Sequence, residues 1–399
     1  MPLSFFTVGL TDLGLFAIAL LLAIPVLVLF GECLAAFWFS KDEKEPVAQS
    51  APSTAILMPA HNEAAVIRPV LEGLLSQLSE QDRVVVIADN CSDETAAIAR
   101  STGVTVIERQ DRDRRGKGYA LDFGLQFLAD HPPEVVVMMD ADCQVQPGTI
   151  SRITRQAIAT QRPVQAIYLM ERPAQPEPKD ALSSLAFLVK NWVRPLGLKQ
   201  LNLPCLLTGT GMAFPWATLQ GVSLASGNIV EDMQMAVDLA IDGHPAFLCP
   251  NTKVIGILPQ QEQVAKTQRT RWEHGHLKTA LTQIPRLVKA AVRQGRVDLL
   301  AIALDLSVPP LSLLVVLWVI SCIAALLGGW FIGNWLPEML LLGEGLLIVL
   351  AIALAWVKFG RDLPFKTLLS IPFYVIWKIP LYLAFLVNPQ TKWVRTERD

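Results

Sequence analysis

Two carboxylates, Asp140 and Asp142, directly follow an apolar run, and their spacing could hold a divalent cation. Residues 135–139 are all apolar, which is typical of a parallel strand that is buried on both faces. Open α/β sheets bind ligands at the carboxyl ends of such strands. Because one residue separates the two acids, both can face one Mg²⁺ or Mn²⁺ ion, directly or through water. Taken alone, such a pair more often lies in a solvated turn between a strand and a loop. Its interpretation therefore depends on the rest of the chain.

The composition of the 399-residue chain argues against a wholly soluble protein. Hydrophobic residues make up 52% and charged residues 18% of the sequence, and the apolar excess lies near its two ends. A formal net charge of -2 gives no indication of a nucleic-acid partner. The six cysteines show no C-x-x-C spacing, which argues against a zinc site or a disulfide framework and favours a reducing, cytosolic environment.

Segments near both ends have the length and composition of membrane-spanning helices. Residues 13–31 carry no charge and are long enough to cross a bilayer. A cleavable signal peptide is the alternative, but residues 1–11 contain no Lys or Arg, so we favour a retained anchor. Lys41 and Lys44 follow this segment and predict that the next domain is cytoplasmic. We therefore expect an integral protein of the plasma (inner) membrane whose next domain lies in the cytoplasm.

Residues 308–331 and 336–357 each predict a further span, and residues 365–387 are a third candidate. Lys378 and two prolines weaken this third candidate, which is alternatively interfacial or re-entrant. Lys358, Arg361 and Lys366 predict that the loop between residues 357 and 365 is cytoplasmic.

The middle of the chain alternates between strand and helix patterns. Short apolar strands at 55–58, 84–88, 104–107 and 135–139 are separated by helical segments. This spacing predicts an α/β fold with a mostly parallel sheet and helices on both faces. We expect three parts: an anchor (1–45), a cytosolic domain (46–290) that ends in an amphipathic helix along the membrane surface, and a membrane region (291–399).

Seven short motifs occur in a fixed order along the middle of the chain. They are Pro59-Ala60-His61-Asn62-Glu63, Asp89 with Ser92 and Asp93, Lys117-Gly118, Asp140-Ala141-Asp142, Gly209-Thr210-Gly211, Glu231-Asp232, and Gln268-Arg269-Thr270-Arg271-Trp272. This succession resembles the family-2 inverting glycosyltransferases of GT-A fold. It is most similar to the membrane-embedded branch of cellulose, hyaluronan, chitin-oligosaccharide and poly-N-acetylglucosamine synthases. The resemblance covers residues 54–287 and implies a metal-dependent hexosyltransferase that forms a β-glycosidic bond from a UDP-sugar.

The resemblance also implies a role for each motif residue. Asp142 would be the main ligand of Mg²⁺ or Mn²⁺, with Asp140 beside it. The nucleotide-sugar site would comprise Glu63, Asp89, Lys117, Asp140 and Arg271. Gly209, Thr210 and Trp272 would bind the acceptor, while Glu231, Gln268 and Arg269 support the motifs. Asp232 would be the base that takes the proton of the acceptor hydroxyl. On local grounds, Asp89 is equally consistent with a helix cap. Glu231 and Asp232 are also consistent with acidic residues that interact favourably with the helix dipole. Trp272 is also consistent with an anchor at the membrane interface.

The expected partners are a nucleotide-sugar donor, a polysaccharide or lipid acceptor and membrane lipids, with a partner subunit left open. The alternatives are a single-sugar transferase that acts on a membrane lipid, as ceramide glucosyltransferases do, and a catalytically silent scaffold. A transporter is disfavoured, because few ionisable residues lie in the predicted spans. Asn90 stands where relatives often have Asp, and no counterpart of the cellulose-synthase gating loop follows Trp272. Processivity, the sugar and the acceptor stay undetermined.

Overall fold

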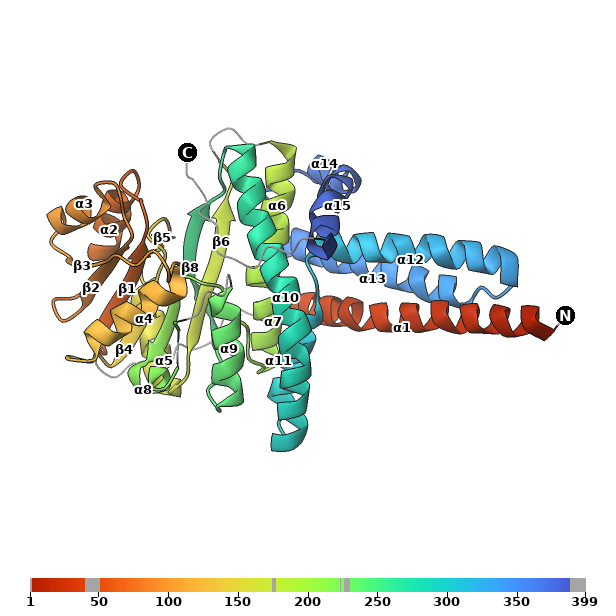
Figure 1. Cartoon of the computed structure of the whole chain (residues 1–399), viewed down its shortest axis with the longest axis horizontal. Helices are drawn as coiled ribbons and strands as arrows, with labels where there is room; N and C mark the ends of the chain where they lie inside the picture. Colours follow the sequence, from red (N-terminus) through yellow and green to blue (C-terminus); the bar gives the residue numbers. More distant parts are fainter. Residues whose placement is uncertain (1, 40–50, 174–176, 223, 226–229, 388–399) are drawn as a thin grey trace. The chain divides into compact units, whose positions relative to one another are not determined.

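The computed structural model describes residues 2–39, 51–173, 177–222, 224–225 and 230–387 (Figure 1). Lys41 and Lys44, on which the predicted orientation depends, lie outside these ranges. The chain divides into two compact units. The membrane unit comprises Met1–Phe39, Glu177–Leu201 and Ala303–Pro389, and the sheet unit comprises Ser40–Pro176, Asn202–Ile302 and the last ten residues. Residues 177–201, which lie inside the expected domain 46–290, fall in the membrane unit.

The sheet unit is built on a mixed, eight-stranded sheet in the order β3-β2-β1-β4-β7-β6-β8-β5. Its strands are β1 (Thr54–Ala60), β2 (Arg83–Asp89), β3 (Thr105–Arg109), β4 (Val135–Met138), β5 (Gln144–Val145), β6 (Val164–Glu171), β7 (Met212–Pro215) and β8 (Phe247–Ile257). Strands β1 to β4 are mutually parallel, as are β6 and β8. Strand β7 is antiparallel to both β4 and β6, and β5 is antiparallel to β8. The predicted α/β sheet is confirmed.

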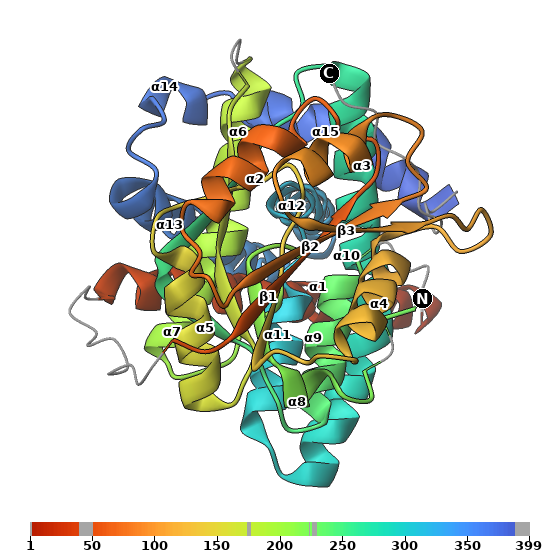
Figure 2. The ribbon, with the colours of Figure 1, turned by 90° about the vertical axis from the view of Figure 1, so that its left-hand side faces the viewer.

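Helices cover both faces of this sheet (Figure 2). They are α2 (Ile67–Leu75), α3 (Thr95–Ser101), α4 (Lys117–Leu128), α5 (Thr149–Thr160), α8 (Trp216–Leu219), α9 (Glu231–Ile241) and α10 (Glu262–Gln294). Apolar residues of α4, α8 and α9 form one buried core with those side chains of β1, β2, β4 and β7 that point to the same face. Alternate residues point to opposite faces of a strand, so fully apolar strands such as β4 can pack helices on both.

The register of β4 determines what lies at its carboxyl end. Met138 is paired with Leu57 of parallel β1 on one side and with Met212 of antiparallel β7 on the other. Because β7 is antiparallel to β4, the residues that precede Met212 lie at the edge where β4 ends. The fold therefore brings Gly209-Thr210-Gly211 beside Asp140.

The membrane unit is helical. Its elements are α1 (Pro2–Trp38), α6 (Pro178–Leu188), the π-helical turn η1 (Val189–Val193), α7 (Arg194–Gln200), the end of α11 (Val297–Ser307), α12 (Leu311–Ile332), α13 (Leu336–Phe359), α14 (Phe365–Leu368) and α15 (Ile371–Val387). Among the described residues, three helices are long and apolar enough to cross a membrane: Thr11–Trp38, Leu311–Phe331 and Leu336–Phe359. The expected anchor and the two expected C-terminal spans coincide with them.

The third C-terminal candidate forms two helices instead of one span. A break near Ser370 separates α14 from α15, and α15 is shorter than the three candidate spans. Lys378 of α15 is buried, with its ammonium 5.2 Å from the ring centroid of Tyr374. The lysine therefore faces protein, which is the condition under which a cation at that position is tolerated.

Polar contacts join α1 to both ends of α13. At one end, the Asn334 amide donates to Asp12 Oδ2 at 2.6 Å. At the other end, Lys358 Nζ donates to the carbonyls of Ala36, Phe37 and Phe39 at 3.2, 2.6 and 2.8 Å. Lys358 thus satisfies carbonyls at the C-terminus of α1, where a cation is favoured. Helices α1 and α13 therefore run in the same direction, and α12, which precedes α13 on the chain, runs in the opposite direction.

A buried ion triad holds α1, α7 and α11 together within the membrane unit. Arg194 of α7 is 5% exposed, and its Nε donates to Glu32 Oε2 at 2.6 Å. Its Nη2 donates to the carbonyl and the carboxylate of Asp305 at 2.6 and 2.5 Å. Burial acts to lower the pKa of Arg194, but the two carboxylates raise it above its ordinary value, so the guanidinium stays charged. The close approach of α7 to α1 depends on Gly197, where a Cβ would overlap the Glu32 carbonyl.

We expect Arg194→Ala to destabilise the membrane unit by about 3–5 kcal/mol, because it leaves two carboxylates buried without their cation. Thermal unfolding of the detergent-solubilised protein measures the effect. Arg361→Ala is the matched control, since Arg361 is exposed, and it should change the melting temperature little. The triple variant Arg194→Met/Glu32→Gln/Asp305→Asn should recover much of the loss. Equal stability of Arg194→Ala and wild type would contradict this role of the triad.

Candidate active site

The carboxylates predicted to bind metal lie in the turn after β4. The Asp140 backbone N–H donates to Thr210 Oγ1 at 3.1 Å, which fixes this turn to the residues before β7. Carboxylate oxygens of Asp140 and Asp142 and the sulfur of Cys143 lie within 4.8 Å of one another. The two acids are partly exposed and the cysteine is buried. One ion could therefore reach both carboxylates from the open side.

Lys117, at the start of α4, joins the carboxylates to the Gly209 loop. Its ammonium donates to Asp140 Oδ1 and, at 2.6 Å, to the Gly209 carbonyl. Burial acts to lower the pKa of Lys117, but Asp140, Glu231 and Asp232 raise it above the ordinary value. The lysine therefore stays charged and stands among three carboxylates.

The acidic pair begins α9 and faces the same loop. A Cβ placed at Gly209 would lie 3.3 Å from Asp232 Oδ2 and 3.6 Å from Lys117 Nζ. Gly209 also has φ +91°, so a side chain is disfavoured there both by the backbone and by the space. Because Gly209 has no side chain, its loop can lie close to both Lys117 and Asp232.

The first acid of the pair, Glu231, has a raised pKa. The pKa of Glu231 is raised to about 7, chiefly because the side chain is buried. Asp232 and Asp140 also act to raise it, whereas Lys117 acts to lower it. Near neutral pH an appreciable fraction of Glu231 is therefore protonated. Asp232 Oδ1 accepts a hydrogen bond from the Met233 N–H at 2.8 Å, which orients this carboxylate at the helix start.

Gln165 of β6 supports the loop and was not among the predicted site residues. It is 2% exposed, it accepts a hydrogen bond from the Thr208 N–H at 2.9 Å, and its Nε2 donates to the Thr210 carbonyl at 2.9 Å. Beside it, Gly211 has φ +66°, and a Cβ there would lie 2.7 Å from Val254 Cγ2. A single glutamine in an apolar strand was the one available sequence signal, because its partners are distant in the chain.

Asp89 ends β2 and pairs with Arg109 instead of capping a helix. Arg109 Nη1 donates to Asp89 Oδ1 at 2.7 Å, while Asp93 accepts the Thr95 N–H at 3.0 Å at the start of α3. Asn90 Oδ1 accepts the Asp111 N–H at 2.8 Å, with Asn90 in the left-handed region at φ +53°. The asparagine that departs from the family pattern thus holds the loop after β3 against the end of β2.

Glu63 lies beyond the end of β1, in the turn that leads to α2. Its N–H donates to Thr95 Oγ1 at 2.7 Å, and its carbonyl accepts the N–H groups of Val66 and Ile67, both at 3.0 Å. Glu63 and Asp89 thus follow adjacent parallel strands, at the same edge of the sheet as Asp140.

The last motif lies in the first half of α10. Arg269 is buried, whereas Gln268, Arg271 and Trp272 are partly exposed. Helices α9 and α10 pack with the same direction, since Asp238 contacts Arg286 and the Ile241 carbonyl accepts from Gln294 farther along both helices. The motif is therefore displaced toward the end of α9 that carries Glu231 and Asp232. At the site itself, contacts join Lys117, Asp140, Gly209 and the acidic pair.

The donor atoms at the end of β4 fit a hard divalent cation. Carboxylate oxygens suit Mg²⁺ and Mn²⁺, and the contact between Lys117 and Asp140 shows that this position attracts a cation. Burial raises the pKa of Cys143 well above its ordinary value, so its thiol stays protonated. Its Sγ lies 3.4 Å from Asp142 Oδ1, where it can donate a weak hydrogen bond. The two aspartates are therefore the ligands this cluster offers.

Comparison with known sequences decides the family. A sequence model described as "Glycosyltransferase like family 2" matches residues 51–275. The chain belongs to this family. The matched region contains every motif discussed above. The more specific membrane branch belongs to the proposal below.

Two curated relatives match short segments of this family-2 chain. The probable glycosyltransferase YdaM of Bacillus subtilis is 32% identical over 99 residues, which is 23% of each chain. The uncharacterized protein MJ1222 of Methanocaldococcus jannaschii is 29% identical over 100 residues, 25% of this chain and 40% of the relative. These matches cover less than half of either relative's length.

The fold of the chain is similar to that of a solved structure. The mannosyltransferase PcManGT of Pyrobaculum calidifontis, solved with GDP-Man and Mn²⁺, has a TM-score of 0.54 and 21% sequence identity. The likeness covers 93% of this chain and 100% of PcManGT. At this identity the comparison shows the fold.

Proposed function

We propose that the protein is a membrane-bound, metal-dependent, inverting hexosyltransferase. It transfers a sugar from a nucleotide-sugar, with UDP-sugar as the expected donor, to a polysaccharide or lipid-linked acceptor and forms a β-glycosidic bond. The observation that carries this proposal is the cluster of Lys117, Asp140, Gly209 and the acidic pair at one edge of the sheet. It combines a cation site with a candidate base, which are the two requirements of the reaction.

The first requirement is control of the negative charge on the leaving diphosphate. Asp142 and Asp140 would hold Mg²⁺ or Mn²⁺, which supplies Lewis-acid stabilisation of the leaving group when bound. Lys117 carries a positive charge beside them and can contact the diphosphate once its bond to Asp140 is exchanged. Glu63 and Asp89, at the ends of β1 and β2, are proposed to orient the donor. Arg271 is proposed to reach the diphosphate from α10.

The second requirement is a base on the acceptor side. Asp232 lies close to Gly209 and Lys117, and we assign it the acceptance of the hydroxyl proton. Attack from the face opposite the leaving group inverts the configuration at the anomeric carbon. Gly209 and Thr210 are proposed to line the acceptor position, because a side chain at Gly209 would meet Asp232. Glu231, Gln268 and Arg269 are proposed to position these groups.

We expect Trp272→Ala to impair acceptor use more than donor binding. The indole ring offers stacking area to a sugar ring but no charge to a diphosphate. Initial rates at varied acceptor concentration, with donor affinity measured on the same preparation, test this expectation. Collapse of donor affinity with unchanged acceptor use would instead place Trp272 in the nucleotide pocket.

The membrane unit supports a cytoplasmic catalytic domain. Helices α1 and α13 run in one direction and α12 in the other, with Lys358 where α1 and α13 end. Lys358, Arg361 and Lys366 lie at or after that end, and the positive-inside bias assigns it to the cytoplasm. Because the chain enters the sheet unit after α1, that unit would lie on the same side, at the plasma (inner) membrane. A partner subunit is compatible with this arrangement.

The second candidate is a transferase that adds a single sugar to a membrane lipid. In the described part of the chain, three helices are long enough to span a bilayer. That is a small assembly to enclose a polymer channel, and a lipid acceptor needs none. Product length separates the two candidates: membranes that contain the protein are incubated with labelled donor, and one added sugar per lipid favours the second.

Release of nucleoside diphosphate from a panel of nucleotide-sugars tests the proposed function. The purified full chain is incubated with Mn²⁺, UDP-sugars or GDP-mannose, and lipid extract as acceptor source. We expect release from one donor, with an equal amount of sugar transferred. GDP-mannose is included because PcManGT was solved with GDP-Man. Failure to bind any donor with Mn²⁺ would overturn the proposal in favour of a non-catalytic scaffold.

A further inference from the structure

The second half of α10 has three faces of different chemistry. One face is buried, as at Leu287 and Ala291. The next face is apolar but exposed, and its members recur at helical spacing. They are Leu281 (71% exposed), Pro285, Val288 and Val292 (79% exposed). An exposed apolar stripe on a helix that is already packed on its other side indicates contact with an apolar medium.

A basic face borders this apolar stripe. Lys278, Arg286, Lys289 and Arg293 are all exposed and lie 100° to 180° around an ideal helix from Leu277, whereas the apolar stripe lies at 20° to 80°. A stripe of cations beside a stripe of exposed apolar side chains is the pattern of a helix at the headgroup level of an anionic bilayer.

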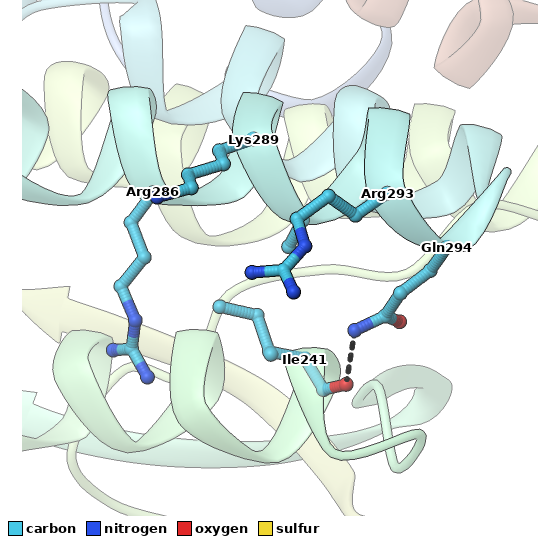
Figure 3. A pocket seen from close by; sticks show the side chains of 6 residues that line it. Ile241, Arg286, Lys289, Arg293 and Gln294 are labelled. Carbon is cyan, nitrogen blue, oxygen red and sulfur yellow. Dashed lines mark hydrogen bonds between the residues drawn. The ribbon is translucent and has the colours of Figure 1, made fainter.

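The basic face contains a pocket between α10 and the end of α9 (Figure 3). Its volume is about 530 Å³, and it is lined by Ile241, Arg286, Lys289, Ala290, Arg293 and Gln294. Arg286 pairs with Asp238, and Gln294 Nε2 donates to the Ile241 carbonyl at 3.2 Å. Within the described residues, Lys289 and Arg293 make no ion pair or hydrogen bond. Lys289 and Arg293 are therefore available to an anionic ligand, whereas Arg286 and Gln294 already bond to α9.

We propose that this pocket binds the phosphate of an anionic phospholipid. Lys289 and Arg293 contact the phosphate, while Val288 and Val292, on the adjoining stripe, contact the acyl chains. The apolar stripe favours a lipid over a free anion, because a soluble phosphate makes no use of it. The chain also continues from Gln294 through α11 to the candidate span that begins at Leu311, which tethers this helix to a bilayer.

The proposed lipid site is separate from the donor site. Ile241 ends α9, whereas Glu231 and Asp232 begin it, and a helix of that length spans roughly 16 Å. The inference rests on the membrane attachment proposed above but not on the transfer reaction. Lipid binding without nucleoside-diphosphate release would therefore refute the proposed function alone, and release without lipid binding would refute this inference alone.

Lipid retention by the full chain in neutral detergent tests the inference. The protein is mixed with micelles that contain radiolabelled phosphatidylglycerol or phosphatidylcholine, and bound lipid is counted after gel filtration. We expect wild type to prefer phosphatidylglycerol, and Lys289→Gln/Arg293→Gln to lose affinity for it roughly tenfold to thirtyfold. Val288→Ser/Val292→Ser should also weaken retention, since it removes the contact with the acyl chains.

The matched control is Lys266→Gln/Arg155→Gln, which also removes one lysine and one arginine that are exposed but belong neither to the basic face nor to the pocket. It should retain phosphatidylglycerol as wild type does, and thermal unfolding verifies that all variants fold. An equal loss in the control would show general surface charge and overturn the proposal. Displacement of the lipid by equimolar inorganic phosphate, or no preference for phosphatidylglycerol, would overturn it as well.

Discussion

Replacement of Asp142 by asparagine is expected to remove nearly all sugar transfer and most Mn²⁺ binding. A neutral amide is a poor ligand for a hard cation, and Asp140 would be the one carboxylate left in the cluster, already in contact with Lys117. EDTA should inhibit wild type for the same reason, and added Mn²⁺ or Mg²⁺ should restore it. Transfer is measured by nucleoside-diphosphate release, and Mn²⁺ binding by electron paramagnetic resonance of the free ion.

Asp130→Asn is the control for this substitution, because Asp130 is exposed and follows α4 on the chain, away from the β4 turn. It should leave both transfer and Mn²⁺ binding unchanged. Full turnover in EDTA would exclude the proposed metal role. Normal Mn²⁺ binding by Asp142→Asn with transfer lost would show instead that Asp142 acts on the donor.

Replacement of Asp232 by asparagine is expected to abolish transfer while donor and metal binding survive. If general base catalysis is the whole contribution of Asp232, the rate falls by roughly 10²-fold to 10⁴-fold. Asparagine keeps the size of the side chain and an oxygen that can accept the Met233 N–H. Donor affinity, measured by calorimetry with Mn²⁺, should therefore change little.

Glu231→Gln is the informative comparison, because the two acids are adjacent but point about 100° apart on the helix. The raised pKa of Glu231, about 7, means that this carboxyl group already carries a proton in part of the molecules at neutral pH. Because the family resemblance assigns the base to Asp232, the rate should fall less in Glu231→Gln than in Asp232→Asn. A larger loss in Glu231→Gln, with folding and donor binding intact, would reverse the assignment of the base.

The raised pKa of Glu231 also has a consequence for stability. The folded protein holds the proton up to about pH 7, whereas an ordinary carboxyl group loses it near 4.5. The folded state therefore binds more protons than the unfolded state between these values. Its stability falls as pH rises through this window. Glu231→Gln should remove this part of the pH dependence.

The sequence alone determined strands β1 to β4, three candidate spans and the order of the motifs. The apolar run before Asp140 predicted β4, and the uncharged ends predicted α1, α12 and α13. These features are local: strand burial, helix length and hydropathy are properties of consecutive residues. The roles of the individual motif residues came from the family resemblance and stay predictions.

Only the tertiary structure decided which of these residues meet. Lys117 contacts Asp140, 23 positions away, and the Gly209 carbonyl, 92 positions away. The second contact depends on β7 being antiparallel to β4, which the pattern of alternating elements does not encode. The supporting role of Gln165, the pairing of Asp89 with Arg109, and the burial of Arg194 between Glu32 and Asp305 were likewise absent from the sequence interpretation. Strand partners and buried ion pairs are selected by the packing of distant segments against one another, so no periodicity within a short stretch of sequence can specify them.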